Sequence, residues 1–233
     1  LGDVELFSRE RLPARVAAIT GTNGKSTTAA LTASLLRACG IDGVVGANFG
    51  DAVLNLPPLG EAGIYVLELS SYQIDLTTSL SADVAVLLNL APDHLERHGG
   101  MAGYVAAKKR LFDLQAPEQI AVVGLDDSES RSLFDELVGA GREVTPVSGI
   151  GPVEHGIYVD RGILHDARTG TPRKLADLQE GALKGAHNWQ NAAAALAVTA
   201  ALGCDEEVAA SALLDFPGLP HRLEQAAEFA GVR

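Results

Sequence analysis

The stretch of sequence that decides the fold is the octapeptide Thr20-Gly21-Thr22-Asn23-Gly24-Lys25-Ser26-Thr27. An apolar run from Val16 to Thr20 precedes it and predicts a buried strand, while the pattern from Ser26 to Cys39 predicts a helix. Glycines let backbone N–H groups turn toward a bound anion, and a helix N-terminus adds positive potential. The octapeptide therefore predicts a phosphate-binding loop (P-loop), in which Lys25 reaches the β- and γ-phosphates and a Ser26 or Thr27 hydroxyl ligates Mg²⁺.

This loop departs from the general P-loop pattern at one position. The pattern G-x-x-x-x-G-K-[ST] places a glycine where Ile19 stands, so the spacing here is the shorter G-x-x-G-K-S. The alternative interpretation is an ordinary strand–helix turn that carries a lysine by chance. The strand before the loop and the helix after it favour a nucleotide site, and MgATP is the expected ligand.

The rest of the chain alternates short apolar runs with helical patterns. This alternation predicts an α/β fold of the P-loop type, with a mostly parallel sheet covered by helices on both faces. Further strands are expected at 43–46, 64–69, 84–89 and 120–124, and further helices at 101–114, 130–138, 188–202 and 206–214. Between 148 and 178 the turn Asp160-Arg161-Gly162 separates two short apolar runs, which predicts a small antiparallel subsheet attached to the main sheet.

The overall composition excludes several classes of protein. The chain has 30 acidic and 18 basic side chains and a net charge of -12, which argues against a nucleic-acid-binding or membrane-binding face. The apolar run from Asn191 to Leu202 is only about half the ~20 residues that a membrane-spanning helix needs. Cys39 and Cys204 have no metal-site or disulfide-framework spacing, and we expect two small buried side chains in a cytoplasmic protein.

Three further groups follow or lie near predicted strands. Glu68 sits near the carboxyl end of one strand, and Asp93-His94 follows the next, so all three are expected at the sheet edge where α/β proteins bind ligands. Carboxylate and imidazole groups can hold a divalent cation. Taken alone, Glu68 could equally face solvent, and a loop histidine is usually exposed. Lys108, within Tyr104-Val105-Ala106-Ala107-Lys108, would by itself be read as part of a solvated basic helix face.

Six segments together resemble the Mur ligase family. They are GTNGKST, VLELSSYQID, LNLAPDHLERH, YVAAK, GAHNWQNAAAA and FPGLPHRLE, and they run in family order from Gly21 to Glu224. The resemblance implies that residues 1–233 form the central ATP-binding domain of a three-domain ligase. The UDP-binding N-terminal domain and the amino-acid-binding C-terminal domain would lie outside this chain.

The resemblance also implies roles for individual residues. Those expected to act in catalysis are Lys25, Glu68, His94 and Lys108, the last as a carbamylated lysine. The expected ligands of two Mg²⁺ ions are Ser26, Glu68, His94 and carbamylated Lys108, with Asp93 beside them. Residues expected to bind ATP are Gly21, Thr22, Asn23, Gly24, Lys25, Ser26, Thr27, Asn188, Asn191 and Arg222. Residues expected to line the acyl-substrate site are Asn48, Ser70, Ser71 and Gln73.

The implied reaction belongs to peptidoglycan precursor synthesis. ATP would phosphorylate the alanyl carboxylate of UDP-N-acetylmuramoyl-L-alanine, and the amine of D-glutamate would attack the resulting acyl phosphate to form an amide and release phosphate. We expect a monomer with no nucleic-acid or membrane partner. Without the flanking domains, we expect the 233-residue chain to bind nucleotide weakly and not to complete ligation.

Three alternative functions fit the sequence less well. Another Mur-type ligase or a folylpolyglutamate-type ligase is the nearest alternative, and the segment LELSSYQ argues against it. A P-loop GTPase switch usually carries an N-K-x-D motif, which is absent from the sequence. A nucleotide sensor without catalytic activity would have no need to keep Lys25, Glu68, His94 and Lys108 together.

Overall fold

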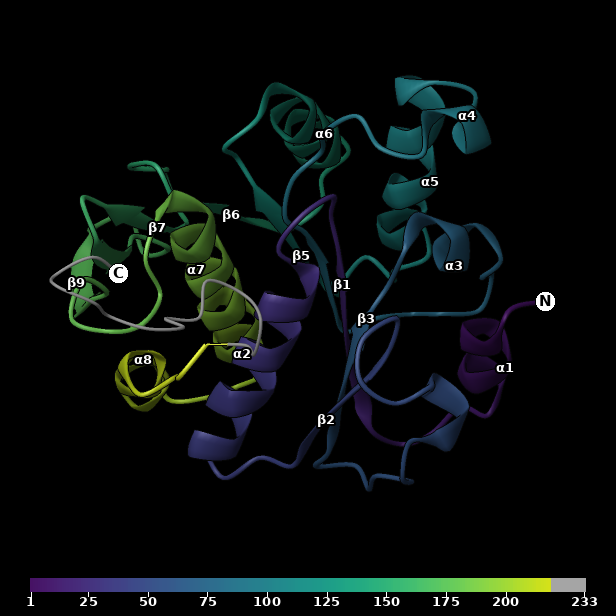
Figure 1. Cartoon of the computed structure of the whole chain (residues 1–233), viewed down its shortest axis with the longest axis horizontal. Coiled ribbons are helices and arrows are strands. Elements are labelled where there is room, and N and C mark those ends of the chain that lie inside the picture. The colour runs from purple at the N-terminus through teal and green to yellow at the C-terminus, as the bar shows by residue number, and fades with distance from the viewer. Residues whose placement is uncertain (219–233) are drawn as a thin grey trace, which may run out of the picture.

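The computed structural model describes residues 1–218, which form one layered α/β structure around a nine-stranded sheet (Figure 1). The strands are β1 (Arg15–Thr20), β2 (Gly43–Ala47), β3 (Ile64–Glu68), β4 (Val84–Leu87), β5 (Ile120–Gly124), β6 (Val144–Ser148), β7 (Ile157–Asp160), β8 (Ile163–Asp166) and β9 (Arg173–Asp177). The helices are α1 (Asp3–Arg9), α2 (Lys25–Ala38), the 3-10 helix η1 (Val53–Asn55), α3 (Ser71–Asp75), α4 (Leu95–His98), α5 (Met101–Asp113), α6 (Ser128–Gly139), α7 (Ala186–Ala201) and α8 (Glu206–Leu214).

The order of the strands places the P-loop strand inside the sheet. The order is β2-β3-β1-β4-β5-β6-β7-β8-β9, so β1 pairs with β3 on one side and with β4 on the other. Pairing is parallel from β2 through β7 and antiparallel from β7 to β9. The predicted mostly parallel sheet with an antiparallel part is confirmed. The carboxyl ends of β3, β1 and β4 therefore lie next to one another, where ligands bind in open α/β sheets.

Side chains alternate between two cores, one on each face of the sheet. In β1, Ala17 and Ile19 face one core while Ala18 faces the other, as the two-residue period of a strand requires. Helices α2, α7 and α8 cover the first face, and α1, α3 and α5 lie on the second (Figure 1). The alanine-rich α7 is buried along most of its length, and its small side chains let it pack closely against α2.

Several elements were not expected from the sequence, among them β6 and α1. Strand β6 contains Pro146, a residue that normally argues against an inner strand, although the strand lies between β5 and β7. Helix α1 is held by the buried Glu5, whose carboxylate accepts hydrogen bonds from the backbone N–H groups of Thr78 and Ser79 at 2.7 and 3.0 Å. The Thr78 bond, with those from Ser79 and from Arg9, lowers the pKa of Glu5 to about 2 despite its burial.

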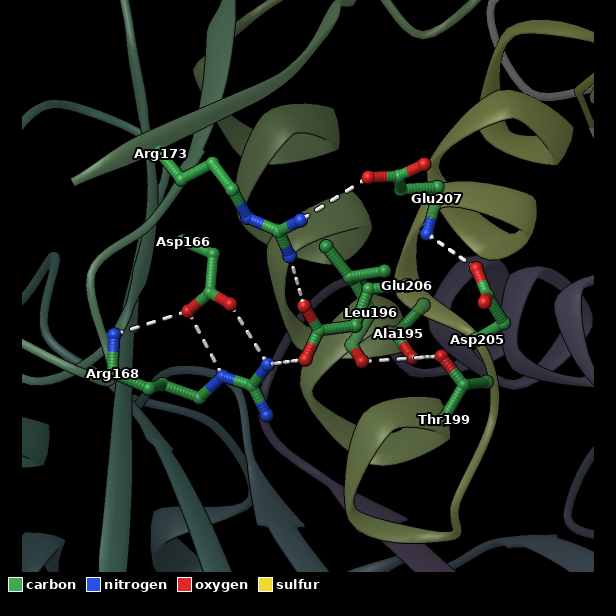
Figure 2. A network of polar contacts seen from close by, with 9 residues as sticks. All are labelled: Asp166, Arg168, Arg173, Ala195, Leu196, Thr199, Asp205, Glu206 and Glu207. Carbon is green, nitrogen blue, oxygen red and sulfur yellow. Dashed lines mark hydrogen bonds and ion pairs between the residues drawn. The ribbon is translucent and has the colours of Figure 1, made fainter. Parts of the chain in front are cut away.

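The antiparallel end of the sheet is joined to α8 by a network of ion pairs (Figure 2). Arg168 makes two bonds of 2.9 Å to the two carboxylate oxygens of Asp166 and also contacts Glu206 of α8. Arg173 of β9 contacts Glu206 and lies 3.3 Å from Glu207. Because every charged group in this network has an opposite partner, we interpret it as structural.

Two other predictions from the sequence concern the cysteines and membrane-spanning helices. Cys204 is buried and Cys39 is half-buried, and both are free thiols at the ends of α7 and α2. Burial raises the pKa of Cys204 to about 12, and Cys39 beside it contributes. No helix in this part of the chain is both long and apolar enough to cross a bilayer.

Candidate functional site

The P-loop connects β1 to α2 at the carboxyl edge of the sheet. Gly21 and Gly24 have φ values of +151° and +87°, which side chains with a Cβ rarely adopt. At Gly24 a Cβ would also collide with the side-chain oxygen of Asn191 from α7. The loop therefore requires glycine at this position for both its backbone conformation and its contact with α7.

Lys25, the first residue of α2, folds its side chain back over the loop. Its Nζ donates hydrogen bonds to the carbonyl oxygens of Gly21 and Thr22 at 3.1 and 2.9 Å. The hydroxyl-bearing residues that follow, Ser26 and Thr27, are buried in the first turn of the helix. This arrangement holds an ammonium group directly above a helix N-terminus, where a phosphate group would be stabilised by both.

The residues after β4 hold the other side of the loop. The Thr22 backbone N–H donates to the Asn89 carbonyl oxygen at 2.9 Å, and the Thr22 hydroxyl accepts from the Ala91 N–H at 3.0 Å. The Thr22 hydroxyl also lies 3.1 Å from the Tyr104 hydroxyl of α5. The P-loop is thus fixed by hydrogen bonds to two neighbouring segments before any ligand is bound.

Lys108 reaches the loop from α5 and is almost completely buried, with 2% of its surface exposed. Its Nζ donates to the Thr20 hydroxyl at 3.1 Å and to the Gly21 carbonyl oxygen at 3.0 Å, so Lys25 and Lys108 share an acceptor. Burial, together with the positive charge of Lys25, lowers the pKa of Lys108 to about 7. Lys108 therefore lies against the P-loop and not on a solvated helix face.

Glu68 ends β3 and is 2% exposed. Its Oε1 accepts a hydrogen bond of 2.8 Å from the Asn48 side chain, while its Oε2 is buried and has no hydrogen-bond partner among residues 1–218. A buried carboxylate oxygen without a partner is unfavourable unless a cation or donor completes its environment. Glu68 therefore has the chemistry expected of a Mg²⁺ ligand, and Asn48 orients it.

His94 lies farther toward the surface than Glu68. It has a left-handed backbone with φ of +50°, its side chain is half exposed, and its Nε2 is 3.4 Å from the Asp93 carboxylate. Its ring also contacts Tyr72 edge-on, with ring centroids 5.2 Å apart. Among residues 1–218, no three His, Cys, Asp or Glu side chains come together as a metal cage.

The predicted acyl-substrate residues have structural partners of their own. Ser70 and Gln73 form a capping box at the start of α3, with each side chain bonded to the backbone of the other. Ser71 is buried, and its hydroxyl lies 3.0 Å from Nε2 of His98. His98, whose side chain is 3% exposed, was not singled out from the sequence because nothing local distinguishes it from an ordinary helix-end histidine.

The predicted adenine-side residues lie at the start of α7. Asn191 is buried and accepts a 3.3 Å hydrogen bond from the Thr28 hydroxyl of α2, while Asn188 lies one turn earlier and bonds to the Lys184 carbonyl oxygen. Arg222, also expected to contact ATP, lies outside the described residues. Asn89 was not singled out from the sequence either, yet it makes several contacts with the P-loop. Its role depends on contacts between distant segments, which no local pattern reveals.

Comparison with known proteins identifies the family of this chain. The family described as Mur ligase middle domain matches residues 19–199, well over half of the chain. The chain belongs to the Mur ligase family. In this member of the family, the P-loop, Glu68 and Lys108 lie at one edge of the sheet.

Curated relatives in this family carry one recurring name. A UDP-N-acetylmuramoylalanine--D-glutamate ligase from Caulobacter sp. (strain K31) is 46% identical over 241 residues and covers 100% of this chain and 51% of its own length. One with the same name from Rhodospirillum rubrum is 49% identical over 233 residues, which is 99% of this chain and 49% of that protein. The chain spans about half the length of these curated relatives.

Two solved structures show the same fold. The MurF ligase from Thermotoga maritima in complex with ADP superimposes with a TM-score of 0.71 at 23% identity, over 97% of this chain and 54% of that one. E. coli FolC in complex with DHPP and ADP gives a TM-score of 0.72 at 22% identity, over 98% of this chain and 64% of that one. At such identities these structures show the Mur ligase fold, and they do not distinguish between substrates.

Proposed function

We propose that this chain is the ATP-binding domain of an enzyme that joins D-glutamate to UDP-N-acetylmuramoyl-L-alanine in peptidoglycan precursor synthesis. Residues 1–233 would form the central domain, between a UDP-binding domain and an amino-acid-binding domain. The complete enzyme would work as a cytoplasmic monomer. The names of relatives that are 46% and 49% identical over nearly the whole chain support this substrate pair.

One observation carries the proposal for the site. The ammonium groups of Lys25 and Lys108 both donate to the Gly21 carbonyl oxygen, at 3.1 and 3.0 Å, and Glu68 pairs in register with Ile19 at the end of β1. Two lysines and a carboxylate with an unpartnered oxygen therefore lie around one phosphate-binding loop. A loop that only held a nucleotide would need Lys25, but it would not need a second buried lysine or the carboxylate.

The chemistry would proceed in two steps. The alanyl carboxylate attacks the γ-phosphorus of ATP, the bond to the bridging oxygen breaks, and ADP leaves. The amine of D-glutamate then attacks the acyl carbon, and phosphate departs as the amide forms. Phosphoryl transfer depends mainly on positioning and on charge stabilisation, so the role of Lys25 is to hold and neutralise the phosphates.

Mg²⁺ would be held by Ser26 and Glu68, with His94 and carbamylated Lys108 as further ligands at two sites. When bound, Mg²⁺ neutralises phosphate charge during the transfer. The unpartnered Oε2 of Glu68 supports the assignment of that residue, and the hydrogen bond from Asn48 supports an orienting role for its neighbour. Asn188 and Asn191 would lie beside the adenine, and Arg222 near the nucleotide. Ser70, Ser71 and Gln73 would shape the acyl-substrate site.

Carbamylation of Lys108 is part of the proposal. The neutral amine attacks the carbon of CO₂ and loses a proton, which turns a buried cation into an anion. The pKa of about 7 supports this reaction, because about half of the Lys108 amine is neutral near that pH. Carbon-13-labelled bicarbonate should give a carbamate resonance in the wild-type chain that is absent in Lys108→Met and present in Lys109→Met. A resonance of equal intensity in both variants would exclude Lys108 as the modified residue.

The nearest alternative is another Mur-type ligase or a folylpolyglutamate-type ligase. The similarity to FolC makes this alternative worth testing, but it concerns the fold alone. A substrate-exchange assay on the full-length enzyme separates the two, because ADP release should require UDP-N-acetylmuramoyl-L-alanine and D-glutamate together. Release with a folate substrate, or with L-glutamate in place of D-glutamate, would contradict the proposal.

The 233-residue chain gives a second test. It should bind MgATP weakly and should not release ADP in response to both substrates, because the residues that bind them would lie largely in the other domains. Ligation by the purified 233-residue chain would show that the assignment of the substrate sites to other domains is wrong.

A further inference from the structure

A series of hydrogen bonds through the Asn89 side chain connects the tip of the P-loop to helix α7. Asn89, just after β4, pairs its side-chain amide with the backbone of Asn23 through two hydrogen bonds. The Asn23 N–H donates to Oδ1 at 2.8 Å, and Nδ2 donates to the Asn23 carbonyl oxygen at 3.1 Å. The amide of Asn89 thus bonds to both backbone groups of one residue, as a neighbouring strand would. Asn23 is exposed, so these bonds fix a loop tip that would otherwise face water.

The same Nδ2 of Asn89 donates a third hydrogen bond, to Oε1 of Gln190 in α7, at 3.3 Å. Gln190 is 3% exposed, and its Nε2 is buried with no hydrogen-bond partner in the part of the chain that the structure describes. The close approach of α7 depends on a glycine in β5, since a Cβ at Gly124 would lie 2.7 Å from that Nε2 and would collide with the Leu88 carbonyl oxygen. The fold therefore leaves space for a glutamine at position 190 that reaches Asn89.

Helix α7 also touches the P-loop at a second point, through Asn191. Its side chain lies against Gly24 and accepts a hydrogen bond from Thr28. Gln190 and Asn191 are consecutive residues, so one turn of α7 contacts both the tip of the loop and the start of α2. The position of α7 is in this way linked to the position of the backbone groups that would meet a phosphate.

We infer that Asn89 is a positioning residue, which together with Gln190 holds the P-loop tip in its phosphate-binding conformation. The inference rests on the proposed function in that the bound phosphates are those of ATP. Asn89 need not touch the nucleotide, because it acts through the Asn23 backbone. Misplacement of a binding group by about an ångström can reduce its contribution many-fold, so a loosened tip should weaken binding of the phosphates most.

The first test needs no nucleotide. Hydrogen exchange of the Asn23 amide, measured by NMR on the 233-residue chain, should be faster in Asn89→Ala than in wild type by about tenfold or more, the effect of losing one good hydrogen bond. Gln190→Met, which keeps the volume but removes the acceptor, should give a smaller increase. Asn55→Ala, an exposed asparagine in η1, should leave the exchange unchanged. Equal exchange in wild type and Asn89→Ala would overturn the inference.

The second test compares two nucleotides. Asn89→Ala should bind ATP about tenfold more weakly and AMP within about twofold of wild type, because AMP lacks the β- and γ-phosphates. Equal losses for ATP and AMP would indicate general damage to the domain and would overturn the inference. If the wild-type chain bound no ATP, the proposed function would fail, and the exchange of the Asn23 amide would still decide the role of Asn89.

Discussion

The two ends of the sheet use charged side chains in opposite ways. At the carboxyl edge around β1, Lys108 is buried with a lowered pKa, and one Glu68 oxygen has no hydrogen-bond partner among the described residues, 1–218. At the antiparallel end, Arg168 and Asp166 form a two-bond ion pair that Glu206 extends. Charges that complete one another stabilise a fold, whereas buried charges left incomplete are unfavourable unless a ligand completes them. Within one domain, the carboxyl edge thus has the character of a binding site, and the antiparallel end has that of a structural contact.

The largest expected effect concerns the stability contributed by Lys108. Its pKa falls from 10.5 in the unfolded chain to about 7, so the unfolded state binds more protons between these values. The free energy of unfolding should therefore rise with pH, by up to about 1.4 kcal/mol per unit, from pH 7 to about 10.5. Lys108→Met should lose this rise and should be more stable than wild type near pH 7.

Urea unfolding across this pH range in CO₂-free buffer measures the effect. Lys109→Met is the matched control, because Lys109 is the adjacent residue but pairs with Asp113 at 2.7 Å and has a raised pKa. If the free energy of unfolding rose with pH as steeply in Lys108→Met as in wild type, burial of the Lys108 amine would not be the cause of the rise.

The second prediction removes the other lysine of the carboxyl edge. Lys25→Met should weaken ATP binding by about 100-fold or more, because an ammonium group that faces phosphates in a partly buried site is lost. Titration calorimetry with MgATP measures the affinity, and Lys109→Met again serves as the control. An affinity within a few-fold of wild type would mean that the lysine of the P-loop does not meet the phosphates.

The third prediction concerns the antiparallel end. Arg168→Ala leaves the Asp166 carboxylate, whose side chain is 8% exposed, without its main partner. The free energy of unfolding should fall by about 1–3 kcal/mol, whereas ATP affinity should stay within about twofold. Arg161→Ala removes an arginine that is 90% exposed from the same subsheet and should change stability by less than about 0.5 kcal/mol. A large loss of ATP affinity in Arg168→Ala would remove the distinction between the two ends.

The smallest expected effect concerns Glu5, a second carboxylate whose oxygens are fully bonded. Because its pKa is lowered to about 2, its contribution to stability is present above pH 4.5 and is lost as the pH falls toward 2. Thermal unfolding between pH 5 and 3 should depend less on pH in Glu5→Gln than in wild type. The exposed Glu10→Gln should follow wild type, and identical profiles for all three proteins would show that Glu5 does not contribute.

The sequence predicted the parts of the fold that are encoded locally. The P-loop between Thr20 and Thr27, its strand and its helix follow from the spacing of glycines and apolar residues. The subsheet follows from the turn at Arg161-Gly162, where both residues adopt positive φ. Strand β6 was missed because Pro146 is locally unfavourable in an inner strand, and α1 because it depends on Glu5 reaching a loop more than 70 residues away.

For the candidate site too, local motifs could be predicted from the sequence and long-range contacts could not. Lys25 follows from its motif, whereas Lys108 stands in a basic run that by itself predicts a solvated face, and only the resemblance to a family indicated otherwise. Asn89 and His98 were missed because their contacts lie in α7, in the P-loop and in α3, and such contacts exist only after the chain folds. Long-range hydrogen bonds leave no periodic or spacing signal in the sequence.

Strand β9, one of the two edge strands of the sheet, has a consequence for how the molecule behaves in concentrated solution. A strand at the edge of a sheet offers unpaired backbone groups to which another chain can add a strand. The exposed Lys174 places a positive charge on this strand that disfavours the approach of an identical strand, whereas the charge of Arg173 is paired with Glu206 and Glu207. The lysine that follows the arginine of the ion-pair network therefore protects this edge of the sheet from self-association.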